Sequence, residues 1–192
     1  MSDPIVVCDY DPRWPERYEA LRARVAAVLG DLAARIDHVG STSVPGLAAK
    51  PTIDIIVMLR SLDDLSVAIE RLAAIGYRHE GDLGISGREA FATPPVYATH
   101  DHHLYVCHPD WPGYADQAAF RDCLRAHPNV ARAYGDLKRA LAIAHRNDRR
   151  AYTEAKAEFV KDVLARAAPR QSSDGHCNPA PGQPKSGPAA AF

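Results

Sequence analysis

The sequence predicts a domain that contains both strands and helices, of class α/β (α+β), followed by a helical C-terminal part. Two observations carry this prediction. Short runs rich in Ile and Val alternate with amphipathic stretches before residue 110, whereas residues 114–167 have helical periodicity almost throughout. The chain has 192 residues, 46% of them hydrophobic, which is enough to bury one good core. We therefore expect one globular domain over residues 1–167.

The first predicted elements are a helix and two strands. Residues 15–29 carry apolar side chains at three- and four-residue steps, which predicts a helix, and Pro15 suits its first turn. Residues 36–39 and 52–59 predict strands, the second of them almost entirely apolar. The shorter apolar run at residues 5–7 predicts a further short strand.

A second helix is predicted to begin at Asp63, because carboxylates favour the positive end of a helix dipole, and to end at Gly76. Residues 77–80 and 88–93 predict two strands joined by a Gly-rich turn. After a histidine-rich strand, helical patterns continue in three pieces, which are separated by Pro128 and by the polar pair at residues 147–148.

Composition changes sharply after residue 167. Residues 168–192 are dominated by Pro, Gly, Ser, Gln and Asn and offer almost nothing to bury, so we predict a disordered tail there. The whole chain balances 23 basic against 24 acidic residues, for a net charge of -1. This balance argues against bulk binding to nucleic acid or to an anionic membrane and favours a small-molecule partner.

The cysteines and the lack of targeting patterns predict where in the cell the protein is located. The four cysteines are far apart and include no CxxC pair, so they are interpreted as reduced thiols. The sequence has no apolar run long enough to span a bilayer and no signal-peptide pattern at its start. We therefore expect a cytoplasmic location.

The stretch from residue 38 to residue 57 is the strongest candidate for chemistry. A predicted strand breaks at Gly40 into a turn that contains Ser41, Thr42 and Ser43. Glycine lets the backbone approach a ligand closely, and the hydroxyl and amide groups of such a turn can bind an anion. The alternative is structural, with Ser41 or Ser43 capping the start of a helix.

The strand that follows carries one carboxylate, Asp54, inside an apolar run, and Lys50 precedes it. A lone charge in such a run is costly unless it has a partner. Lys50 could hold a phosphate and Asp54 a divalent metal. The alternative interpretation is a structural strand Asp, and composition alone leaves both interpretations open.

Four of the nine histidines lie in the segment 100–108. Strand alternation places His103 on one face together with Asp101 and Tyr105, and His102 on the other face. A buried, hydrogen-bonded histidine is commoner than a ligand, so this crowding alone does not define a site.

Six strings follow one another along the chain: YDPRWPERY, HVGSTSVPGLAAKPTIDIIV, GISGREAF, HHLYV, FRDCLRAHP and YTEAKAEFV. Together they resemble the GrpB family, which is placed in the nucleotidyltransferase superfamily, from about residue 5 to residue 163. The resemblance implies a nucleotidyltransferase-like fold, in which a mixed sheet is flanked by helices and followed by a helical part. Similar domains occur fused to dephospho-coenzyme A kinases, which suggests nucleotide or cofactor metabolism.

In that superfamily a Gly-Ser turn precedes a strand with two carboxylates two positions apart, which hold Mg²⁺ against a triphosphate. Residues 40–41 and Asp54 match this pattern, but the second carboxylate position is Ile56. One carboxylate holds a divalent metal poorly. His103 and His38 are candidates to complete the set with Asp54, and such a mixed set suits Zn²⁺, Mn²⁺ or Fe²⁺ better than Mg²⁺.

The resemblance thus implies two functions from different classes. One is a metal-dependent nucleotidyl or phosphoryl transferase that uses a divalent metal (Mg, Mn or Zn), with Asp54 and His103 as catalytic residues. The alternative is a degenerate, non-catalytic module that binds a nucleotide or another anion, which Ile56 favours. The expected metal ligands are Asp54, His103 and His38. The expected ligand-binding residues are Gly40, Ser41, Thr42, Ser43, Lys50 and Arg88.

Overall fold

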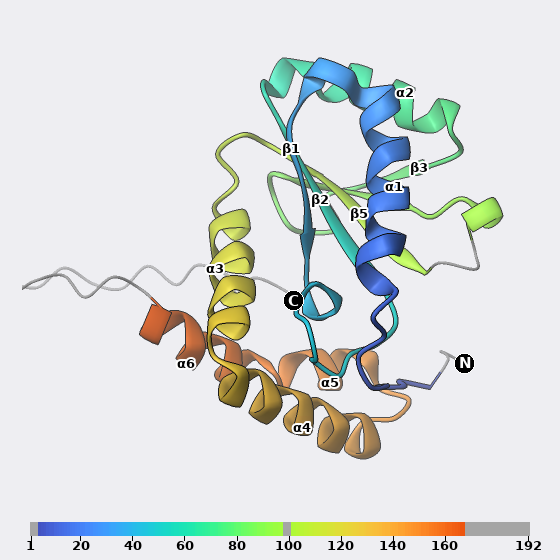
Figure 1. Ribbon diagram of the computed structural model, residues 1–192. Coiled ribbons are helices and arrows are strands. Elements are labelled where there is room, and N and C mark those ends of the chain that lie inside the picture. Colours follow the sequence, from blue (N-terminus) through green and yellow to red (C-terminus); the bar gives the residue numbers. More distant parts are fainter. Residues whose placement is uncertain (1–3, 98–100, 168–192) are drawn as a thin grey trace, which may run out of the picture.

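The computed structural model describes residues 4–97 and 101–167 (Figure 1). At its centre is a five-stranded sheet with the strand order β1-β2-β5-β4-β3. Strands β2 and β5 pair in parallel, and the pairs β1–β2, β5–β4 and β4–β3 are antiparallel, so the predicted mixed sheet is confirmed. The strands are β1 (Ala33–Val39), β2 (Ile53–Leu59), β3 (Arg78–Gly81), β4 (Arg88–Ala92) and β5 (His102–Cys107).

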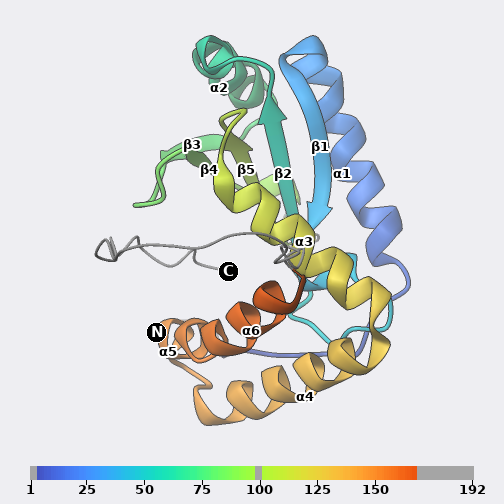
Figure 2. The same cartoon turned by 90° about the vertical axis from the view of Figure 1, so that its left-hand side faces the viewer.

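Helices cover both faces of this sheet. Helices α1 (Trp14–Leu29) and α2 (Leu65–Ala74) lie on one face, and α3 (Pro112–Ala126) crosses the other (Figures 1 and 2). Strand β2 carries apolar side chains on both faces of the sheet, so both faces need a cover. Ile55 and Val57 pack into the core under α1 and α2. On the opposite face Ile56 packs with Trp111 at the start of α3.

The C-terminal helices form a separate layer below the sheet (Figure 2). They are α4 (Pro128–Ala144), α5 (Arg149–Glu154) and α6 (Ala157–Ala167). An apolar cluster joins them to α3 and to the segment after β1, since Val44 and Leu47 pack with Phe120, Tyr134 and Val160. This cluster fixes the turn after β1 between the sheet and the helical layer. The short 3-10 helices are Gly30–Leu32, Ser41–Ser43, Leu62–Asp64 and Pro95–Tyr97.

Two of the predicted elements differ from the structure. Residues 5–7 do not form a strand: the Ile5 amide donates to the carbonyl of Arg146 at 2.8 Å, and its side chain packs against Tyr152, so this segment serves the helical layer. The third helical piece divides into α5 and α6 at the turn around Lys156. The tail predicted over 168–192 lies outside the described residues.

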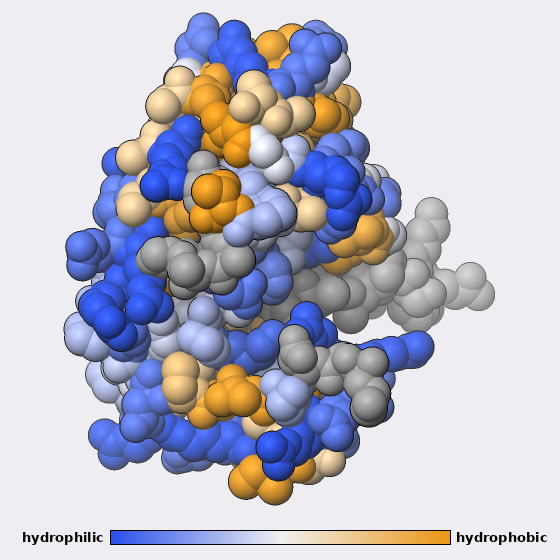
Figure 3. All heavy atoms as spheres, turned by 90° about the vertical axis from the view of Figure 1, so that its right-hand side faces the viewer, coloured by the Kyte–Doolittle hydropathy of each residue, from blue (hydrophilic) through white to orange (hydrophobic). Residues whose placement is uncertain are grey.

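The surface in Figure 3 carries hydrophobic residues in small separate groups among hydrophilic ones. The largest exposed apolar side chains come from different elements and include Val6, Leu83, Val96 and Ile143. Over residues 4–97 and 101–167, no helix is both long enough and apolar enough to cross a membrane. The described cysteines, Cys8, Cys107 and Cys123, are free thiols.

Candidate functional site

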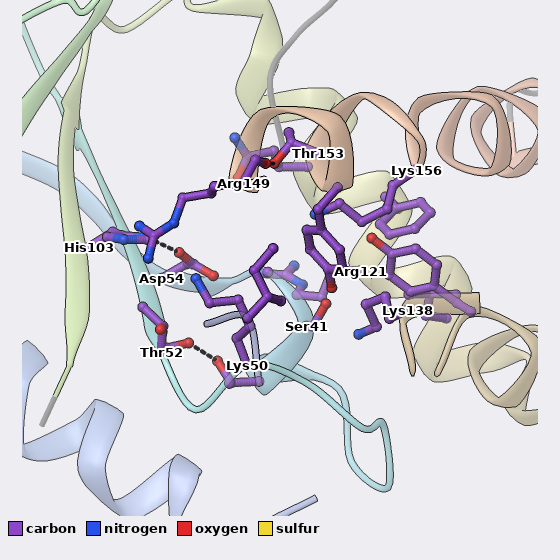
Figure 4. Close-up of a pocket in the computed structure, with 18 of the residues that line it drawn as sticks. Ser41, Lys50, Thr52, Asp54, His103, Arg121, Lys138, Arg149, Thr153 and Lys156 are labelled. Atoms are coloured by element: carbon purple, nitrogen blue, oxygen red, sulfur yellow. Dashed lines mark hydrogen bonds and ion pairs between the residues drawn. The ribbon is translucent and has the colours of Figure 1, made fainter. Parts of the chain in front are cut away.

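A cavity of about 300 Å³ lies between the sheet and the C-terminal helices (Figure 4). Its walls come from the turn after β1, from β2, β4 and β5, and from α3 to α5 with the turn before α6. Side chains from the sheet on one side and the helices on the other converge on it. Among the described residues it is lined by six cationic side chains: Lys50, Arg88, Arg121, Lys138, Arg149 and Lys156.

The turn after β1 begins with a glycine that no other residue could replace without strain. Gly40 has φ 70°, and a Cβ built on it would collide with the carboxylate of Asp54. The absence of a side chain therefore lets the Asp54 carboxylate lie directly against the backbone of the turn. This close approach is the physical reason for a Gly at the position that the sequence pattern indicates.

The three hydroxyl residues of the turn have different roles. Gly40, Ser41 and Thr42 line the cavity, and the Thr42 hydroxyl donates to the Thr52 carbonyl at 3.1 Å. The Ser43 hydroxyl instead donates to the Gly40 carbonyl at 2.6 Å, so it braces the turn and is not a cavity-lining group. The capping interpretation is wrong, because the N-cap position of this 3-10 turn is Gly40, without a side-chain cap.

Two arginines of α3 hold the same turn in place. The Arg125 guanidinium donates to the Ser43 carbonyl at 2.7 Å, and that of Arg121 donates to the His38 carbonyl at 3.1 Å. Helix α3 thereby ties the turn to the rest of the fold.

Asp54 and His103 form an acid–base pair in the cavity wall. They are register partners on the parallel strands β2 and β5, and His103 Nδ1 lies 2.9 Å from Asp54 Oδ1. The hydrogen bond to Asp54 is the main cause that raises the pKa of His103. The sequence predicts both residues as catalytic, and the structure brings them together facing the cavity.

His38 does not join this pair. Its register partner is Ile55, which faces the core under α1, so the ring lies on the opposite face of the sheet from Asp54. The ring stacks on Tyr18 with centroids 4.6 Å apart, and its Nε2 lies 3.0 Å from Thr42 Oγ1. Burial lowers its pKa to about 4, so it is neutral near pH 7.

The donors around Asp54 do not fit a metal held by three protein side chains. Over the described ranges, no three His, Cys, Asp or Glu side chains are placed to hold a metal ion. Position 56, on the same face two residues after Asp54, is a fully buried Ile in an apolar cluster with Val39 and Trp111. One carboxylate that already pairs with an imidazole, among many cations, is a poor donor set for Mg²⁺.

Arg88 and Lys50, both predicted ligand-binding residues, line the cavity. The Arg88 side chain is buried, lies over the ring of Tyr105 at 4.3 Å, and leaves its Nε without a hydrogen-bond partner among the described residues. Burial lowers the pKa of Lys50. Both cations are thus partly desolvated and face the same space as the turn.

Four cations that line the cavity from the helical side were not predicted from the sequence: Arg121, Lys138, Arg149 and Lys156. Lys138 carried a signal, since it follows Tyr134 by four residues and precedes Ala142 by four, both of them buried positions of one helix face. A lysine on an apolar helix face is unusual enough to be noted. Arg149 and Lys156 carried no such signal, because each lies beside a helix break.

These features define a class of protein: a mixed α/β domain whose sheet and C-terminal helices enclose a basic cavity with one carboxylate–histidine pair. The family model described as GrpB protein matches residues 4–166, and the chain belongs to this GrpB family.

Relatives agree with this membership. The chain is 32% identical to the Glutamate-rich protein GrpB of Alkalihalophilus pseudofirmus, over 83% of this chain and 94% of that protein. It is 38% identical to the UPF0157 protein YqkA of Bacillus subtilis, over 79% of this chain but 44% of that relative, so it spans less than half of YqkA. The crystal structure of conserved protein GrpB from Enterococcus faecalis superposes with a TM-score of 0.76 at 33% identity, covering 84% and 96% of the two chains.

One further relative has a named activity of its own. The chain is 29% identical to a dephospho-CoA kinase of Mycolicibacterium paratuberculosis, over 85% of this chain and 46% of that kinase.

Proposed function

We propose that the protein binds a nucleotide or another phosphate-bearing small molecule in the basic cavity. The observation that carries the proposal is the charge of the lining: among the residues that the structure describes, six Lys and Arg side chains from both walls surround one carboxylate, that of Asp54. Partly desolvated cations that converge on a cavity favour an anionic ligand, because the anion supplies the missing counter-charge. A volume of about 300 Å³ suits a compact ligand.

In this proposal the sheet side of the cavity holds one phosphate. The backbone and hydroxyls at Gly40–Thr42 approach it from the turn, Lys50 approaches it from the loop before β2, and Arg88 approaches it from β4. Arg88 offers the planar donor fork that suits phosphate oxygens, whereas Lys50 offers a point charge.

A transfer reaction is the second candidate, and the Asp54–His103 pair is the observation that favours it. A hydroxyl of an acceptor placed beside Asp54 would pass its proton to this pair as its oxygen bonds to phosphorus. The bond from phosphorus to the leaving phosphate oxygen breaks in the same substitution, and nearby cations stabilise the departing charge. The donors around Asp54 do not fit a metal held by the protein alone, so no step is assigned to one.

A thermal-shift screen tests the binding proposal. The purified protein is heated with nucleoside triphosphates and with coenzyme A precursors, each with and without Mg²⁺, Mn²⁺ or Zn²⁺. The similarity to a relative named dephospho-CoA kinase motivates the coenzyme A arm. A ligand at about a hundred times its dissociation constant should stabilise the fold by about 2.7 kcal/mol, which moves the melting temperature measurably.

Matched variants locate the binding. Ser41→Ala and Lys50→Met should weaken binding by about ten- to a hundredfold, because each hydrogen bond to a charged group contributes about 1.5 to 3 kcal/mol. Lys161→Met on the exposed side of α6 is the control and should bind as the parent does. Product formation on incubation would favour the transferase, and binding without product would favour the non-catalytic module. A screen in which no phosphate compound shifts the melting temperature would refute the proposal.

A further inference from the structure

Lys138 is the most unusual ionisable group in the molecule. Its side chain comes from the middle of α4, retains 2% of its exposure, and leaves its Nζ without a hydrogen-bond partner among the described residues. The Nζ lies 4.5 Å from the centroid of the Tyr134 ring, and this cation–π contact offsets only part of the cost of burial. The amine lines the cavity, so a ligand there could reach it.

Lys156 repeats this arrangement on the neighbouring element. It lies in the turn between α5 and α6, is partly buried, and its Nζ lies 4.4 Å from the centroid of the Tyr152 ring. Figure 4 shows Lys138 and Lys156 on the helical side of the cavity, opposite Asp54 and His103. The helical wall therefore presents two lysines, each backed by a tyrosine ring, that belong to none of the motifs on the sheet side.

We propose that Lys138 and Lys156 form a second anion subsite on the helical wall, and that the ligand is a polyphosphate whose phosphates extend from the Gly40–Thr42 turn to α4. This inference rests on the proposed function and specifies its ligand class. The amine of Lys138 has no hydrogen-bond acceptor among the described residues, and a phosphate oxygen would supply one. A ligand with one phosphate would occupy the sheet side of the cavity and would not give the Lys138 amine a hydrogen-bond acceptor.

The charges around Lys138 agree with an anion at this wall. Burial is the main cause that lowers its pKa to about 7, and Lys156 and Arg139 lower it further, while Asp54 acts weakly in the opposite direction. The pKa of Lys156 is lowered to about 8, again mainly by burial, with Asp54 raising it and Lys50 lowering it.

The cavity also carries Arg88, His103, Tyr105, Arg121 and Arg149. None of these is an acid that could neutralise two lysines. A bound polyphosphate would raise both lysine pKa values, so binding near pH 8 should take up protons.

Calorimetric titration with inorganic tripolyphosphate and with orthophosphate tests the subsite. Lys138→Met keeps an unbranched side chain of similar length and removes its charge, and Lys161→Met is the matched exposed control. We expect Lys138→Met to weaken tripolyphosphate binding by about ten- to a hundredfold, while Lys161→Met stays within about twofold. Titrations at about pH 8 in two buffers of different ionisation enthalpy should show proton uptake by the parent and less uptake by Lys138→Met.

The outcomes separate this inference from the proposed function. If tripolyphosphate binds the parent and Lys138→Met equally well, with equal proton uptake, the inference is overturned, and weaker binding by Ser41→Ala would still uphold the proposed function. If the parent prefers orthophosphate to tripolyphosphate, the ligand class is wrong although the cavity binds anions. If the parent binds neither compound, nor any in the screen, both proposals fail. A melting temperature of ligand-free Lys138→Met at or above that of the parent shows that lost binding is not lost folding.

Discussion

Replacing Lys138 with Met should stabilise the ligand-free protein, and the gain should depend on pH. The substitution removes an amine that has no hydrogen-bond partner among the described residues and keeps an unbranched side chain of similar length in the same space. An ammonium in that position is costly because it has given up its hydration without gaining an acceptor. Met has no such cost.

The pKa of Lys138 gives the magnitude and the sign. It is lowered from 10.5 to about 7, and each pKa unit corresponds to about 1.4 kcal/mol, so the protonated amine costs the fold of the order of 5 kcal/mol. Below about pH 7 both states carry the proton and the full cost is present. Between about pH 7 and 10.5 the unfolded chain binds a proton that the folded protein does not, so the stability of the parent rises with pH. Above that window neither state is charged, and the cost is gone.

Urea unfolding at about pH 6, 8 and 10 measures this difference, with the fluorescence of the buried Trp14 and Trp111 as the signal. At each pH the unfolding free energy of the parent is subtracted from that of the variant. This difference cancels the contributions of other titrating groups, such as Tyr18, whose pKa is raised to about 12. The stability of Lys138→Met relative to the parent should be greatest at about pH 6 and smallest at about pH 10. Lys156→Met should gain less, because its pKa falls only to about 8. If Lys138→Met is less stable than the parent at the lowest pH, or if its gain in stability is the same at every pH, the buried amine does not carry the cost assigned to it.

Three further predictions concern the turn, the acid–base pair and the tail. Gly40→Ala should lower the melting temperature and abolish ligand binding, because its Cβ would collide with Asp54 at a φ of 70°; an unchanged melting curve would show that the turn is not under this constraint. Asp54→Asn should lower the pKa of His103, measured by NMR titration of the imidazole protons, since their hydrogen bond is the main cause of the raised value; a pKa that does not fall would mean that the pair does not form in solution. Deleting residues 168–192 should leave the melting temperature nearly unchanged, because that segment offers almost nothing to bury; a large drop would place part of it in the core.

Much of the fold could be predicted from local patterns. The apolar run at 52–59 and the helical period of 15–29 predict β2 and α1 to within one residue, since each segment buries a whole face or both faces. The prediction of a strand at 5–7 was wrong, because Ile5 and Val7 pack on the distant helices α4 and α5 instead of pairing with a neighbouring strand. Local periodicity contains no information about such a partner.

The candidate site was predicted on the sheet side and missed on the helical side. Gly40 and Asp54 occur in one continuous stretch, so spacing alone indicated that they meet. Lys138 reaches the same cavity from α4, more than eighty residues away along the chain, and the packing of α4 in the cluster with Leu47 and Phe120 brings it there. His38 was misplaced for a related reason: strand parity puts it on the face opposite Asp54, and that parity depends on the register with β2.

A crystal structure of the protein, from crystals grown with tripolyphosphate, would show directly whether a polyphosphate spans the cavity from the turn after β1 to α4. We predict phosphate density inside the cavity, with oxygens within hydrogen-bond distance of the Ser41–Thr42 turn at one end and of Lys138 Nζ at the other. Density confined to the outer surface, or a cavity that stays free of phosphate while calorimetry shows binding, would contradict it.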